Sequence, residues 1–173
     1  MIYFNKTCSS YQVHVFLHSF LSIRIVAKVF FDWLKIIKLS RVLNTHIQNN
    51  SGFIWPLIKT DYFLSMIGPV SMSNLMELNL FEKAMSAVPN QERGCYLQEN
   101  QPWELSFIYS WRQNNHSNNL LGIPHSSVRY WDLRYFFDSR SYFSDEDCSL
   151  PLPDNVGVNG IAAKKLYIEH GYP

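Results

Sequence analysis

Paired histidines and a glycine-rich turn are the first places to look for chemistry in this chain. His14 and His18 are four residues apart, a spacing that can present two imidazoles to one metal ion, but no third ligand accompanies them. Gly157 and Gly160 precede an apolar and basic segment and resemble a turn that opens a helix. They lack the strand and lysine order of a phosphate-binding loop, so both motifs predict ordinary structural roles.

An acidic triplet is the third candidate. Residues 145–147 read Asp-Glu-Asp and stand beside Cys148, a pattern typical of a solvated loop. No serine, cysteine or histidine cluster has a spacing that indicates nucleophilic catalysis. We therefore predict no metal and no cofactor, and we expect that the protein is not an enzyme.

Length, composition and charge narrow the class of protein. The 173 residues are 47% hydrophobic, 16% aromatic and 17% charged, which suits one domain-sized unit with a core. The net charge is only +1, so no global field attracts nucleic acid, and we expect no direct nucleic-acid binding. Three scattered cysteines predict neither a disulfide framework nor a zinc site and favour a reducing compartment, nuclear or cytoplasmic.

The first 48 residues predict a basic amphipathic helix. From Tyr11 to Leu43 there is no glycine or proline, and polar side chains recur mostly at steps of three or four. This spacing places Arg24 through Lys38 on one stripe and leaves most of the circumference apolar. Such a helix needs a partner, which is a core of this protein, another chain or a membrane surface, unless the segment is a poorly ordered hydrophobic leader.

Three further segments follow. Residues 49–72 contain turn and breaker residues and predict a linker. Residues 73–101 predict a short helix and a loop, since Asn74 and Glu77 suit a capping box and Pro89 ends the pattern. The tail, 138–173, predicts an acidic loop followed by a short helix over 161–169.

After Pro102 the hydrophobic period changes from about 3.6 to 2. Over residues 104–111, alternate side chains fall on one face of an expected strand, and residues 128–137 are again aromatic-rich and strand-like. The fold class expected is therefore α+β, with N-terminal amphipathic helices followed by antiparallel strands over 102–137.

The segment Ser126–Arg134 resembles the end of a repeat in the WD-repeat β-propeller family. The resemblance rests on Val128, Trp131 and Asp132, and it implies that Trp131 packs between blades while Asp132 turns the chain out of a strand. Residues 102–137 would then form a partial or degenerate propeller blade. A closed propeller needs at least four blades, so the chain would be a divergent member or a fragment whose other repeats lie outside it.

The ending Trp-Asp-Leu-Arg is similar to a form found in WD-repeat substrate receptors of cullin–RING ubiquitin ligases, loosely those of the denticleless type. In these proteins the arginine contacts the damaged-DNA-binding adaptor of cullin-4-type ligases. The resemblance implies that Arg134 is an adaptor-binding residue and that the protein is a protein-interaction module with protein partners.

Two other functions remain open. The N-terminal helix favours a membrane-surface-associated protein. In addition, Gln101–Phe107 resembles the last barrel strand of class I fructose-bisphosphate aldolases, which would make the chain a fragment of an aldolase-like enzyme.

Overall fold

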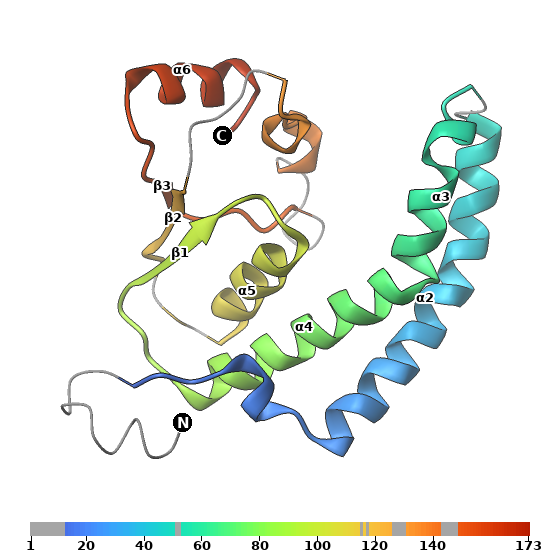
Figure 1. Cartoon of the computed structure of the whole chain (residues 1–173), viewed down its shortest axis with the longest axis horizontal. Helices are drawn as coiled ribbons and strands as arrows, with labels where there is room; N and C mark the ends of the chain where they lie inside the picture. Colours follow the sequence, from blue (N-terminus) through green and yellow to red (C-terminus); the bar gives the residue numbers. More distant parts are fainter. Residues whose placement is uncertain (1–12, 51–52, 115, 117, 126–130, 143–148) are drawn as a thin grey trace. The chain divides into compact units, whose positions relative to one another are not determined.

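The chain forms two compact units, Met1–Ala84 and Met85–Pro173 (Figure 1). The computed structural model describes residues 13–50, 53–114, 116, 118–125, 131–142 and 149–173. The first unit is helical, and the second combines helices with a small sheet. The helices of the first unit are η1 (Leu17–Phe20), α2 (Ile23–Asn50), α3 (Trp55–Met66) and most of α4 (Pro69–Ala87).

Aromatic side chains hold the helices of the first unit together. Helices α2 and α3 lie side by side (Figure 1). The Tyr62 hydroxyl of α3 donates a 2.7 Å hydrogen bond to the backbone carbonyl of Ser40, and the Trp33 indole N–H donates to the carbonyl of Ile67 at 2.9 Å. The segment 49–72, expected to be a linker, thus contains a packed helix that begins with Pro56 in its first turn. None of the described helices has the length and hydropathy needed to cross a membrane.

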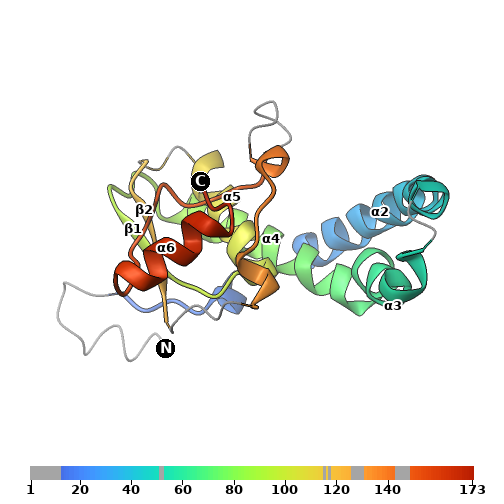
Figure 2. The same cartoon turned by 90° about the horizontal axis from the view of Figure 1, so that it is seen from above.

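The second unit contains a three-stranded parallel sheet in the order β1-β2-β3. Its strands are β1 (Gly94–Gln98), β2 (Leu120–Pro124) and β3 (Asn155–Val156). Helix α5 (Pro102–Gln113) connects β1 to β2, as parallel neighbours require a crossover. After β2 the chain passes through η2 (Leu133–Tyr135) and η3 (Ser139–Ser141), drawn in orange, before β3 and α6 (Ile161–Glu169), drawn in red (Figure 2).

The main core lies between α5 and one face of the sheet. Its buried members are Tyr96, Ile108, Trp111 and Leu120. Gly94 permits this packing, because a Cβ added there would lie 2.7 Å from the Trp111 ring. On the opposite face of the sheet, side chains of β1 and β2 remain exposed. A second, smaller core joins Tyr135 to Tyr167 of α6.

The strand predicted over residues 104–111 is wrong, because this segment is part of α5. Gln101 and Glu104 form a capping box around Pro102 in the first turn, which is a strong helix start. Glu104, Ile108 and Trp111 are buried, a spacing of four and three residues that fits one helix face. The local start signal therefore outweighs the period-2 pattern, and the aldolase-like strand expected at Gln101–Phe107 is likewise helical.

The prediction of a propeller blade is also wrong. The strands are parallel rather than antiparallel, and no blade occurs in the described part of the chain. Val128 lies outside the described residues. Trp131, expected to pack between blades, is 81% exposed, and Asp132 caps the short helix η2 by accepting a hydrogen bond from the Arg134 backbone N–H. The described end of this motif, Trp131–Arg134, leads into η2 and belongs to none of the three strands.

Candidate functional site

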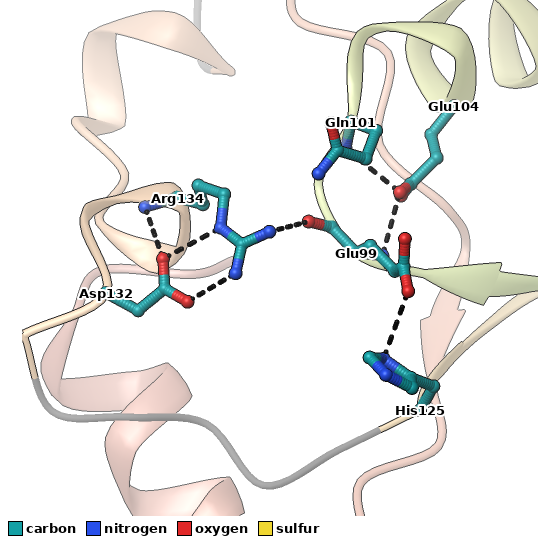
Figure 3. A network of polar contacts seen from close by, with 6 residues as sticks. All are labelled: Glu99, Gln101, Glu104, His125, Asp132 and Arg134. Atoms are coloured by element: carbon teal, nitrogen blue, oxygen red, sulfur yellow. Dashed lines mark hydrogen bonds and ion pairs between the residues drawn. The ribbon is translucent and has the colours of Figure 1, made fainter.

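The carboxyl ends of parallel strands are where open α/β sheets gather functional side chains. In this unit β1 ends at Gln98, and the next three residues turn the chain into α5. β2 ends at Pro124 and is followed by His125. Side chains from these two strand ends and from η2 lie close together in Figure 3.

Gln98 is the centre of a buried polar network. Its side chain is 1% exposed, and its amide nitrogen donates to Asn100 Oδ1 at 3.2 Å and to the Tyr172 hydroxyl at 3.4 Å. Its carbonyl oxygen accepts a 3.5 Å contact from the Tyr167 hydroxyl. Gly122 of β2 leaves room for this network, since an added Cβ would stand 3.0 Å from Gln98 Oε1 and press on that side chain. The network ties β1 to α6 and to the C-terminal segment.

Burial in this network changes the pKa of the tyrosine next to Gln98. Burial raises the pKa of Tyr172 to about 12, although the hydrogen bond from Gln98 acts in the opposite direction. Burial also raises the pKa of Tyr96 and of Tyr167. All three hydroxyls are therefore neutral in the folded state across the ordinary pH range.

A pH dependence of stability follows from Tyr172. Because its folded pKa lies above the ordinary value of 10.0, its contribution to stability is complete below pH 10 and decreases as the pH rises toward 12. The free energy of unfolding of the wild type should decrease between pH 9 and pH 11. In Tyr172→Phe this decrease should be smaller by about 1 kcal/mol. Urea unfolding at both pH values measures this, and equal losses in the two proteins would contradict it.

Glu104 stabilises the turn between β1 and α5. Its carboxylate accepts hydrogen bonds from the backbone N–H of Glu99 at 2.7 Å and of Gln101 at 2.9 Å, and the side chain is 2% exposed. Burial raises the pKa of Glu104, and these backbone hydrogen bonds partly offset that shift. The carboxylate also lies at the N-terminus of α5, where a negative charge is favourable. The N-terminus of α5 thus already has a carboxylate beside it, that of Glu104.

An outer network surrounds this turn (Figure 3). Arg134 binds Asp132 in a two-point ion pair, with Nε–Oδ1 and Nη2–Oδ2 distances of 2.9 and 2.7 Å. Its third nitrogen donates to the backbone carbonyl of Glu99 at 3.3 Å. The hydrogen bonds that the guanidinium donates to Asp132 raise the pKa of Arg134 further. His125 Nδ1 lies 3.2 Å from Glu99 Oε1, so both strand ends and η2 meet at one place.

A pocket of about 250 Å³ opens between these two networks. This volume is slightly below the range of about 300–1,000 Å³ typical of ligand sites. Its polar wall includes Gln98, Asn100, Glu104 and Arg134, and its apolar wall includes side chains of α5 and the segment 150–153. The pocket therefore offers a few fixed polar groups beside an apolar surface.

Asn100 is the unusual residue of this pocket. Its φ of 54° lies in the left-handed region, which asparagine tolerates better than most residues. Its Nδ2 atom is buried and has no hydrogen-bond partner among the described residues, whereas its Oδ1 accepts from Gln98. A buried donor without a partner is costly, and native structures contain few of them.

The predicted site residues are only partly at this site. The structure brings Arg134 to the pocket wall, with Asp132 paired to it, whereas Trp131 is exposed and Val128 lies outside the described residues. The adaptor-binding role of Arg134 stays a prediction. Asn100, Gln98 and Glu104 were missed, although the sequence Gln101-Pro102-Trp103-Glu104 carries a helix-start signal that could have located the turn. No group of three or more metal-ligating side chains gathers in the parts of the chain that the structure describes.

Comparison of the chain with protein-family models, with curated proteins and with solved structures finds no match. The function of this protein is therefore inferred from the geometry of the site.

Proposed function

We propose that residues 85–173 bind a small, polar molecule without negative charge in the pocket at the carboxyl ends of β1 and β2. The observation that carries this proposal is the Asn100 Nδ2 donor, which is buried in the pocket wall and has no partner among the described residues. A ligand with a carbonyl or hydroxyl oxygen would satisfy this donor. The position, at the carboxyl edge of a parallel sheet, is the usual one for ligands in open α/β folds.

The charges around the pocket exclude an anion as the favoured ligand. In the described part of the site, Glu99, Glu104 and Asp132 carry carboxylates. Arg134 is already engaged by Asp132 in the two-point pair. Glu104, at the third position of α5, already places a carboxylate near the helix N-terminus, the other place where an anion could be held. A negatively charged ligand would stand beside the carboxylates of Glu99 and Glu104 with no cation left to hold it in the described part of the site, whereas a neutral ligand would not meet this repulsion.

Two small probes that both offer an oxygen acceptor, one neutral and one negatively charged, test this proposal. We expect N-methylacetamide, at millimolar concentration, to shift the Asn100 side-chain amide signal in a ¹⁵N-correlated NMR spectrum. Acetate at equal concentration and ionic strength should shift it much less. The physical reason is that both probes offer an oxygen acceptor, whereas only acetate adds a negative charge beside Glu104.

Asn100→Gly removes the donor and keeps the left-handed backbone, so it should abolish the shifts of neighbouring backbone signals. Asn90 provides the matched control, because it has a φ of 59°, is exposed and does not line the pocket. Asn90→Gly should retain the response to N-methylacetamide. Equal shifts with acetate, or an unchanged response in Asn100→Gly, would show that the pocket does not bind as proposed.

A further inference from the structure

Helix α2 exposes a continuous line of large apolar side chains. Ile23, Val26, Phe30 and Leu34 follow one another at steps of three or four residues, and Phe31 lies beside Phe30. All five are exposed, Ile23 to 82%. We call these five residues the apolar stripe. Isolated apolar residues on a surface are ordinary, whereas a contiguous helical stripe indicates an interaction site.

The face of α2 next to the stripe is already used by the fold. Val29 and Ser40 are each 1% exposed, and Trp33 donates its hydrogen bond to Ile67 from this side of the helix. The helix is therefore held in its unit by one face, and the apolar stripe is available for contact without unfolding.

Basic side chains accompany the apolar stripe. Helix α2 carries five basic residues and one acidic residue, Asp32. Lys38 and Arg41 follow Leu34 at steps of four and seven residues, so this basic line continues the apolar stripe on the same side of the helix, and both residues are exposed. Lys28 pairs with Glu82 and Lys35 with Asp32, yet both lysine side chains are more than half exposed. Lys28 and Lys35 lie on a different side of α2 from most of the stripe, so Lys38 and Arg41 are the charged residues that border it.

We propose that the apolar stripe binds the surface of a bilayer that contains anionic lipids. An in-plane helix buries apolar side chains at the headgroup boundary while flanking lysines and arginines contact anionic headgroups. Their long aliphatic stems reach over the apolar surface and keep the charge in water. Charge complementarity selects this occupant over a second copy of the chain, because two copies joined through this helix would bring two basic lines together.

Vesicle co-sedimentation of the full chain tests this. We expect the protein to pellet with vesicles of 70% phosphatidylcholine and 30% phosphatidylglycerol in 50 mM salt. It should largely remain in the supernatant with pure phosphatidylcholine or when the first mixture contains 500 mM salt, since screening removes the attraction between headgroups and basic side chains.

Two variants separate the apolar and the charged contribution. The triple variant Ile23→Ser, Phe30→Ser, Leu34→Ser should weaken binding at least about tenfold. A matched control, Leu133→Ser, Ile161→Ser, Ile168→Ser, replaces three exposed apolar residues of the second unit and should bind like the wild type. Arg24→Gln, Lys38→Gln, Arg41→Gln leaves the apolar stripe intact and should remove most of the preference for the anionic vesicles. This charge variant also covers the case in which the serine variant fails to fold.

Several results would overturn the proposal. One is wild-type protein that stays in the supernatant with anionic vesicles. Another is equal binding by the wild type and the folded serine variant, or a preference for anionic vesicles that survives in the charge variant. A wild-type dimer in light scattering that becomes monomeric in the serine variant, without vesicle binding, would assign the stripe to a second copy instead.

Discussion

Replacing Trp111 with alanine is expected to lower the free energy of unfolding by about 3–5 kcal/mol. The Trp111 side chain is 5% exposed and packs in the core of the second unit against Leu120, Phe107 and the Gly94 backbone. Its ring also lies 4.6 Å from that of His116. Truncation would leave a cavity between α5 and the sheet that the surrounding residues can fill only in part. Urea unfolding of the full chain, followed by the signal of the second unit, measures the loss.

Trp131 provides the matched control for Trp111. It is the tryptophan that the repeat-like motif placed in a core, yet the structure leaves it 81% exposed. Trp131→Ala should therefore change the free energy of unfolding by no more than about 0.5 kcal/mol. A loss of several kcal/mol in Trp131→Ala, or a small loss in Trp111→Ala, would show that the two side chains have the opposite roles.

The second large effect is expected at Glu104. Glu104→Ala should destabilise the protein by about 2–4 kcal/mol, because it leaves the buried N–H groups of Glu99 and Gln101 without their shared acceptor. Glu104→Gln keeps one acceptor oxygen and should cost less. Glu169 is an exposed glutamate in a helix of the same unit, so Glu169→Ala should have almost no effect. Urea unfolding of the four proteins at pH 7 gives this comparison.

The pH dependence of the Glu104→Gln penalty tests the electrostatics separately. Burial raises the pKa of Glu104 in the folded state, so the wild-type carboxyl contributes most below its ordinary pKa of 4.5 and less as the pH rises. The penalty of Glu104→Gln should therefore be larger at pH 4.5 than at pH 7. A penalty that grows with pH would mean that the backbone hydrogen bonds lower the pKa of Glu104 more than burial raises it.

Helices with clear local boundaries were predictable. The helix expected at 161–169 is α6, and the short helix expected between residue 73 and Pro89 corresponds to α4, which begins earlier, at Pro69, and ends at Ala87. The N-terminal apolar and basic pattern corresponds to α2. These features depend on side chains within a few residues of one another, so the amino-acid sequence alone contains the information for them.

The site was harder to predict from the sequence, because its residues come from three places in the chain. Arg134 reaches the carbonyl of Glu99, and His125 reaches the Glu99 side chain, only after β1 and β2 pair in parallel across α5. The alternation over residues 104–111 suggested a strand, and nothing in that pattern shows that a capping box at Gln101 and Glu104 begins a helix instead. With α5 mistaken for a strand, an antiparallel pairing was expected, and the carboxyl edge could not be located.

The amino-acid sequence by itself determined the helices with caps and breakers and the basic, apolar character of α2, since these rest on contacts between near neighbours along the chain. Only the tertiary structure decided the parallel pairing, the burial of Trp111 instead of Trp131, and the placement of Asn100 in a pocket wall. The physical reason is that these features depend on which surfaces α5 and the sheet bury together. That burial is a property of segments distant in the chain and leaves no local periodicity of its own.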